Sequence, residues 1–159
     1  MSLSTILANV RTQLATAIGG AVIIHDGIRH APDDSTFRAL FRDTANSRLN
    51  AWMVTHSATD EEFDGLNSLS IRTHEIVCVG LYALDDPGAG TSMTSEIAFR
   101  AQVESVAAQL RQNYTLGGQA MNASPPDTAV FELRMFHSHL CHYAEVRFDA
   151  LERVSYTGP

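Results

Sequence analysis

The chain is 159 residues long and contains 11 arginines, no lysine and 18 acidic residues, so its formal net charge is −7 with neutral histidine. This acidic balance disfavours general adhesion to nucleic acid or to an anionic membrane, because both need a cationic surface. A content of 45% hydrophobic and 18% charged residues is typical of a folded domain, and we expect one domain over residues 1–159. No apolar run is long enough to span a bilayer, and two cysteines, Cys78 and Cys141, are too few for a disulfide framework. We therefore expect a soluble protein with reduced thiols.

The first part of the sequence predicts an amphipathic helix followed by a short strand. Apolar residues recur at three- and four-residue steps over residues 3–18, which is the spacing of one helical face. These residues are Leu3, Ile6, Leu7, Val10, Leu14 and Ile18. Gly19 and Gly20 end this helix, and the apolar residues 21–24 predict a buried strand. A surface loop with a single helical turn at residues 37–41 follows.

Residues 49–84 predict two strands separated by a long polar segment. In residues 49–55, alternation places Trp52 and Val54 on one face and the residues between them on the other. Residues 56–70 are rich in Ser, Thr, Asp, Glu and Asn, and we expect a long exposed loop of the kind that often binds a partner. The centre of residues 71–84 is apolar on both faces, which is typical of an inner strand.

The second half predicts one more helix and two adjacent strands. The helix over residues 95–113 has an apolar stripe, and Ser92 or Thr94 can cap it. The stripe consists of Phe99, Val103, Val106 and Leu110. Alternating residues at 130–136 and 144–151 predict neighbouring strands. The residues of these strands that we expect in the core are Phe131, Leu133, Val146 and Phe148.

These elements predict an α+β fold. We expect a single mostly antiparallel or mixed β-sheet of about five strands, with two main α-helices packed on it. Such an arrangement buries both helical stripes against one sheet.

A histidine-rich stretch between the last two strands is a weak candidate for a metal site. His137, His139 and Cys141 would share one side of a continuous strand, and alternate residues of a strand can chelate a metal. However, a hairpin needs a turn near residues 138–141, and the spacing matches no established zinc signature. We expect these residues to be ordinary polar residues at a strand junction.

Other catalytic motifs are missing from the sequence. It has no nucleophile elbow, no phosphate loop, which requires a lysine, and no complete dinucleotide fingerprint. The acidic residues of segment 56–70 lack the spacing of a calcium-binding loop. We therefore expect neither an enzyme nor a cofactor; the alternative from another class is a metal-dependent enzyme that uses His137, His139 and a carboxylate such as Glu145.

Six segments together resemble the tail terminator proteins of long-tailed phages, which are small proteins of the phage neck. They are ILANVRTQL (6–14), AVIIHDG (21–27), LNAWMVT (49–55), HEIVCVGLYAL (74–84), SEIAFRAQVESVAAQL (95–110) and LCHYAEVRFDALERV (140–154). The resemblance covers nearly the whole chain in the order and length of its elements. LCHYAE is its most distinctive string.

The resemblance implies a structural protein of the virion, assembled in the bacterial cytoplasm. Six copies would form a ring at the head-proximal end of the tail tube, stop tube polymerisation and provide the joint to the head–tail connector protein. The implied partners are other copies of the chain, the tail tube protein and the connector, while DNA passes through the ring without specific binding. Another ring-forming neck component, such as a head completion or adapter protein, is the nearest alternative, and a small-ligand-binding domain is a third.

A ring of this kind needs two different contact surfaces on each subunit, which exposed loops and free strand edges can provide. We expect these contacts in segments 56–70 and 85–94, with arginines pairing with carboxylates across subunits. The candidate interface residues are Asp60, Glu61, Glu62, Phe63, Asp64, Asp85, Asp86, Arg48 and Arg72. The net charge also leads us to expect a lumen without cationic side chains.

Overall fold

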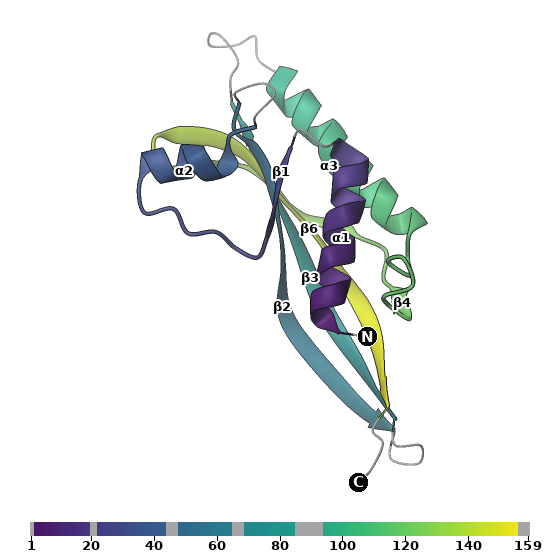
Figure 1. Ribbon diagram of the computed structural model, residues 1–159. Coiled ribbons are helices and arrows are strands. Elements are labelled where there is room, and N and C mark those ends of the chain that lie inside the picture. The colour runs from purple at the N-terminus through teal and green to yellow at the C-terminus, as the bar shows by residue number, and fades with distance from the viewer. Residues whose placement is uncertain (1, 20–21, 44–47, 65–68, 85–93, 156–159) are drawn as a thin grey trace.

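The computed structural model describes residues 2–19, 22–43, 48–64, 69–84 and 94–155. Within these residues the chain forms three helices and a six-stranded mixed sheet (Figure 1). In chain order the elements are α1 (Leu3–Ile18), β1 (Ile23–Asp26), α2 (Asp34–Phe41), β2 (Asn50–Asp64), β3 (Leu69–Ala83), α3 (Thr94–Gln112), β4 (Asn122–Ala123), β5 (Asp127–Phe136) and β6 (His139–Ser155). The predicted α+β class, with helices packed on one sheet, is confirmed.

The three longest strands, β2, β3 and β6, form the centre of the sheet. The order of the strands is β1-β2-β3-β6-β4, and β5 also pairs with β6. β1 runs parallel to β2, whereas the other pairings are antiparallel. At the middle of the sheet, Cys78 of β3 lies between Val54 of β2 and Val146 of β6.

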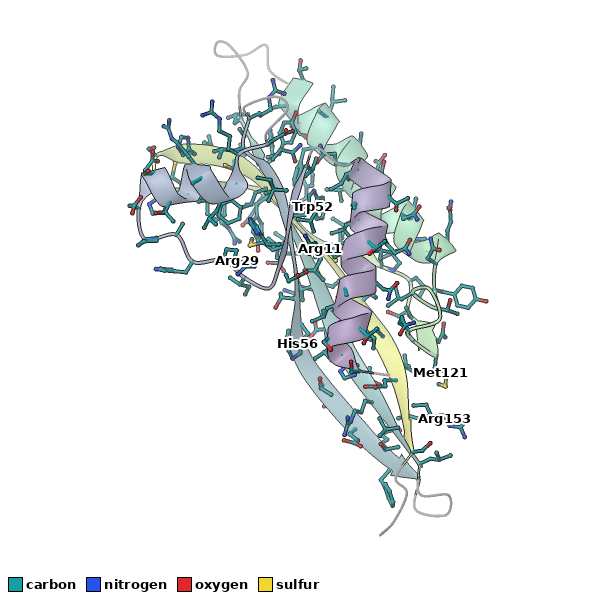
Figure 2. The ribbon with its side chains drawn as sticks, in the orientation of Figure 1. Arg11, Arg29, Trp52, His56, Met121 and Arg153 are labelled. Atoms are coloured by element: carbon teal, nitrogen blue, oxygen red, sulfur yellow. The ribbon has the colours of Figure 1, made fainter. Side chains whose placement is uncertain are left out.

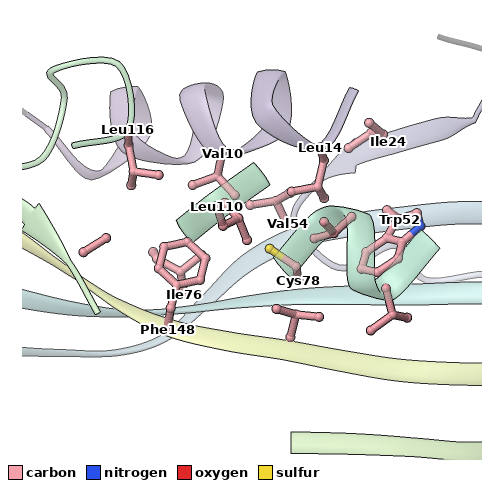
Figure 3. Packing of buried hydrophobic residues seen from close by; sticks show 14 of the residues in the cluster. Val10, Leu14, Ile24, Trp52, Val54, Ile76, Cys78, Leu110, Leu116 and Phe148 are labelled. Atoms are coloured by element: carbon pink, nitrogen blue, oxygen red, sulfur yellow. The ribbon is translucent and has the colours of Figure 1, made fainter. Parts of the chain in front are cut away.

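α1 and α3 cover one face of the sheet and bury the main hydrophobic core (Figure 1). α1 has its predicted bounds, and three residues of its predicted stripe, Ile6, Val10 and Leu14, are fully buried. The stripe predicted for the second main helix is buried in α3. Figure 3 shows Val10 and Leu14 pointing from α1 toward the sheet, where Cys78 lies. Burial raises the pKa of the Cys78 thiol to about 12, so this cysteine stays protonated and unreactive.

Trp52 of β2 lies in this core and packs against α3. Its ring is fully buried and lies 6.2 Å from the ring of Phe99, centroid to centroid. Gly80, which pairs with Trp52 across the two strands, leaves the space that the indole occupies. A Cβ atom at residue 80 would lie only 2.8 Å from the Trp52 ring. The glycine is therefore needed for the packing of the tryptophan.

α2 covers the opposite face at one end of the sheet (Figure 1). Phe37 and Phe41 belong to a second hydrophobic cluster that includes Met53 of β2. Asp33 caps the helix, because its Oδ1 accepts a hydrogen bond from the backbone N–H of Thr36 at 2.8 Å. This bond lowers the pKa of Asp33. α2 is eight residues long, which is longer than the single helical turn that we expected here.

The largest correction concerns segment 56–70, which we expected to be a loop. β2 continues to Asp64 and β3 begins at Leu69, so only residues 65–68 of this segment lie outside the described strands. The segment lacks an alternation of apolar and polar residues because its side chains pair with one another across the strands. A bulge at Ser57 shifts the register by one residue.

Two smaller expectations were also wrong. The first strand spans residues 23–26 rather than 21–24. Leu133 is 52% exposed and lies outside both hydrophobic clusters, whereas Val146 and Phe148 are buried and Phe131 packs against the main core. The alternation in β5 identified the strand correctly but did not reveal which face is covered. Ser92 and segment 85–90 lie outside the described residues.

We predict that Gly80→Ala destabilises the fold by about 1–3 kcal/mol, because the new methyl group must displace the buried indole of Trp52. Urea unfolding followed by the fluorescence of Trp52, the one tryptophan of the chain, measures this change. Ala108→Ser on the exposed side of α3 is the control and should change the free energy of unfolding by less than about 0.5 kcal/mol. Equal stability of the two variants would contradict the packing described for Trp52.

Candidate assembly surfaces

Three long strands continue past the N-terminal end of α1 and form an arm (Figure 1). We define the arm by the strand pairing as residues 57–64 of β2, 69–75 of β3 and 149–155 of β6. The helices that bury the core lie at the other end of these strands (Figure 1). The arm therefore has to be held together largely by contacts between its own strands.

A polar network inside the arm takes the place of an apolar core. Oε1 of Glu61 accepts a hydrogen bond from the hydroxyl of Ser70 at 2.5 Å, and its Oε2 lies 3.0 Å from Nε of Arg72. Between β3 and β6, Nε2 of His74 hydrogen-bonds Oε2 of Glu152 at 3.0 Å. The His74 and Glu152 side chains are only 3% and 2% exposed. Two of the candidate interface residues, Glu61 and Arg72, thus pair with each other inside one subunit.

The arm is strongly acidic. Its sequence contains seven acidic residues and two arginines, which are Asp60, Glu61, Glu62, Asp64, Glu75, Asp149 and Glu152, and Arg72 and Arg153. Asp60 and Glu62 lie on the outermost strand and form no ion pair with the described residues. Of the candidate interface residues, Asp60, Glu61, Glu62, Phe63, Asp64 and Arg72 belong to the arm, whereas Asp85 and Asp86 lie outside the described residues.

Phe63 is a large apolar residue near the tip of the arm and is 63% exposed. It pairs directly with Ser70, so both side chains point to the same face of the sheet. Ser70, His74 and Ile76 alternate along β3, and Ile76 belongs to the core beneath α1 and α3. Phe63 therefore faces the same side as these two helices.

The opposite face of the sheet contains an apolar groove of about 410 Å³ beside α2. Its floor comes from the strands, and its walls come from α2, from the segment before α2 and from the hairpin of β5 and β6. The lining residues are Ile28, Arg29, His30, Ala31, Phe37, Phe41, Met53, Val79, Leu81, Arg134, Met135, Phe136, His137 and Tyr143. Ile28 and Met135 are 73% and 61% exposed, so the groove has an exposed apolar rim.

Arg134 and Tyr143 contact each other and line the side of the groove nearest β5. The guanidinium of Arg134 lies 3.7 Å from the centre of the Tyr143 ring and also pairs with Glu132. Burial, together with a hydrogen bond to Glu145, raises the pKa of Tyr143 to about 12. The same hydrogen bond, helped by Arg147, lowers the pKa of Glu145.

A second, polar hollow of about 280 Å³ lies at the end of α2. Arg38, Arg42 and Arg48 line it together with Ser138 and His139. Five of the 11 arginines, counting Arg29 and Arg134, therefore line the two hollows. Neither hollow has a described acidic residue in its lining. Arg38 and Arg134 are paired with Asp34 and Glu132, which lie outside the linings. The linings of the two hollows are thus rich in arginine, and the arm is rich in carboxylates.

Arg48, a candidate interface residue, belongs to the polar hollow rather than to the arm. Its Nη1 donates a hydrogen bond to the hydroxyl of Tyr82 at 2.8 Å, and its guanidinium lies over the Tyr82 ring. Figure 2 shows Arg29 on the α2 side of the molecule and Arg153 on the arm.

Two of the longer strands have open edges within the described part of the chain. β1 pairs only with residues 51–54 of β2, which leaves the outer edge of residues 55–64 without a neighbouring strand. On the other side of the sheet, β5 pairs with β6 along one edge only. Open edges are ready sites for contact with another chain.

The candidate metal residues instead connect the last hairpin to α2. His137 lies in the two-residue turn with φ of 51°, and its Nε2 donates to the carbonyl oxygen of Ala31 at 3.1 Å. Nε2 of His139 accepts a hydrogen bond from Nε of Arg38 at 3.0 Å. Cys141 is fully buried in the cluster beneath α2. The two histidines thus form hydrogen bonds with different groups, although both of their rings pack against Phe37.

Neighbouring residues complete these contacts. Ser138 donates to Oδ1 of Asp34 at 2.6 Å, and this bond, with help from the charge of Arg38, lowers the pKa of Asp34. The same Oδ1 lies 3.0 Å from Nε2 of His139, but a nitrogen that accepts a hydrogen bond from Arg38 carries no proton to donate. His142 points to the other face and hydrogen-bonds Ser95 at 2.8 Å. In the described ranges, no three His, Cys, Asp or Glu residues are grouped as metal ligands.

Reasoning from the sequence missed the groove, because its parts come from four separate segments. Ile28 and Met135, which form its exposed apolar rim, lie 107 positions apart in the printed sequence. The available signal was an apolar residue in an otherwise polar loop, Ile28, but one exposed apolar residue is common on protein surfaces.

No protein-family model matches this chain, and a search of curated proteins finds no significant match. None of the described helices is both long enough and apolar enough to cross a membrane.

We predict that Glu152→Ala destabilises the protein by about 1–3 kcal/mol, because it leaves a ring nitrogen of buried His74 without its partner. The measurement is the free energy of unfolding in urea. Arg153→Ala, an exposed neighbour on the same strand, serves as the matched control and should have an effect below about 0.5 kcal/mol. A loss no larger than that of the control would show that the polar network does not stabilise the arm.

Proposed function

We propose that this protein is a tail terminator of a long-tailed phage. Six copies form a ring on the head-proximal end of the tail tube, stop its polymerisation and provide the joint to the head–tail connector protein. The protein acts by surface complementarity rather than by catalysis.

The observation that carries this proposal is that one subunit has two dissimilar surfaces. The arm is acidic and has an open strand edge, whereas the α2 end has two arginine-lined hollows and the β5 side has a second open edge. Dissimilar complementary surfaces produce head-to-tail contacts, and such contacts form a closed ring when their rotation closes. A subunit that only forms two-fold dimers needs one self-complementary surface instead.

Two further features support the proposal. One is the resemblance of six segments of the sequence to tail terminator proteins. His137 and His139 contact Ala31 and Arg38, so they support the hairpin that borders the groove. Both features agree with a protein that functions through contacts with other subunits.

The acidic net charge also fits a ring through which DNA moves. Phosphate groups are repelled by carboxylates and held by arginines, so a lumen with few arginines lets DNA pass without being retained. We therefore expect the arginine-lined hollows to be covered by neighbouring copies rather than to face the lumen.

We predict a particle of about 104 kDa, six copies of the 17.3 kDa chain, by native mass spectrometry, alone or on tail tubes. Co-sedimentation with isolated tail tubes and with filled heads separates a terminator from a head-side adapter. A terminator binds the tube ends first. Binding to heads but not to tubes would favour the adapter, and a monomer that binds neither would contradict both.

A further inference from the structure

We propose that the free protein forms a two-fold dimer in which the outer edge of β5 pairs with the outer edge of β5 in a second copy. The two strands run antiparallel and are centred on Leu133, so the sheets of the two copies join into one. This inference goes beyond the proposed ring and does not rest on it, because the pairing uses neither the arm nor the polar hollow.

The backbone of β5 has hydrogen-bonding groups that point away from its own sheet. The carbonyl oxygen of Leu140 in β6 accepts a hydrogen bond from the N–H of Leu84 at 3.0 Å, on the β3 side of that strand. Bonded and non-bonded pairs alternate along an antiparallel ladder, so Met135, the partner of Leu140 in β5, turns its N–H and C=O outward. Leu133 and Phe131 follow at two-residue steps in an unbroken register and do the same. A second strand can pair with these groups.

The outer edge of β5 lacks the features that usually prevent pairing between sheet edges. Prolines, bulges and clustered charges are common examples of such features. Residues 130–136, VFELRMF, contain no proline, no glycine and no shift of register, and five of the seven are apolar. The outer edge of β2 has a bulge at Ser57 and four acidic residues between positions 60 and 64. Of these two edges, the edge of β5 is therefore better suited to pair with another strand.

The charges on this edge are complementary to themselves. In an antiparallel pair centred on Leu133, Glu132 lies opposite Arg134 of the second copy, and Arg134 lies opposite Glu132. Within one subunit these two side chains form an ion pair and remain 47% and 44% exposed. Each arginine would therefore have one carboxylate on its own strand and another across the pair. A shift of two residues in the register would place like charges opposite one another, so the charges select this register.

The other face of the pair brings exposed apolar side chains together. Leu133 and Met135 are 52% and 61% exposed. Leu133 would lie opposite its own copy, and Met135 would lie opposite Phe131, whose ring packs against the main core. A methionine sulfur beside an aromatic ring is a favourable contact. Leu133, which one subunit leaves outside both of its hydrophobic clusters, would thus be covered by the second copy.

The symmetry of the pair differs from the symmetry of the ring. A two-fold contact joins identical surfaces of two copies, whereas neighbours in a single ring meet through different surfaces. The pair therefore has to separate when the subunits close into one ring on a tail tube. Until then, it covers an edge that is otherwise open to other strands.

Sedimentation equilibrium of the free protein tests whether the dimer exists. We expect a mass of about 35 kDa, two copies of the 17.3 kDa chain. Leu133→Lys places two ammonium groups opposite one another at the centre of the pair and should weaken dimerisation at least about tenfold. Ala108→Lys on the exposed side of α3 is the control and should leave dimerisation unchanged. Circular dichroism and the fluorescence of Trp52 show whether both variants are folded.

A disulfide locates the contact. A residue at the centre of the pair lies about 5.5 Å from its copy, Cα to Cα, which a disulfide can span. Leu133→Cys should therefore form a disulfide-linked dimer under mild oxidation, while the buried native cysteines react slowly. Met135→Cys is the matched control, because it is similarly exposed on the same face but would lie about 13 Å from its own copy along the strands. It should form little disulfide.

A charge exchange adds a second readout. Glu132→Arg places arginines opposite one another, and Arg134→Glu does the same with carboxylates, so each variant alone should dimerise at least about tenfold more weakly. When the two variants are mixed, each arginine lies opposite a glutamate. The mixture should therefore form a heterodimer, which native mass spectrometry distinguishes by its mass.

The outcomes separate the pairing from the ring. The pairing is wrong if the free protein is a monomer at all concentrations or a hexamer without this disulfide. It is also wrong if a dimer forms but Leu133→Lys and the charge variants leave it unchanged. Neither result affects the ring, which binding to tail tubes tests. If the dimer has the expected disulfide but the protein binds no tube, the ring fails and the pairing stands.

Discussion

The continuous pairing of β2, β3 and β6 is the constraint on which the rest of the structure depends. Near one end these strands carry the two hydrophobic clusters, and at the other they continue as the arm. Because backbone hydrogen bonds run through both parts, the arm is fixed relative to the groove within one subunit. A contact between the arm and another subunit would therefore set the angle from each copy to the next.

The arm also shows how a strand can be stable without an apolar core. Serine, threonine, histidine and glutamate side chains bond across the strands, and the buried pair of His74 and Glu152 lies among them. Such a network needs every member satisfied, because an unpaired buried polar group is costly. Phe63 lies on the same face of the sheet as this network, whereas Asp60 and Glu62 lie on the opposite face.

Much of the fold could be predicted from the sequence, because helical and strand periodicity reflects burial. The stripes of α1 and α3 and the alternation of Trp52 and Val54 were correct for this reason. The arm was mistaken for a loop because polar cross-strand pairing produces no apolar period. The candidate interface residues Glu62 and Phe63 lie close together because they are neighbours in the sequence. The groove was missed because its lining comes from distant segments. Leu133 was placed in the core because alternation alone does not show which face of an edge strand is covered.

Two dissimilar surfaces on one rigid sheet provide the physical basis of the proposed ring. Five of the 11 arginines line the two hollows at the α2 end, and seven of the 18 acidic residues lie on the arm. The most direct test is an electron cryomicroscopy reconstruction of the protein assembled on the end of a tail tube. We predict a sixfold ring in which the arm of each subunit lies on the α2 side of its neighbour. A two-fold dimer, or a ring whose arms contact no neighbouring subunit, would contradict this account.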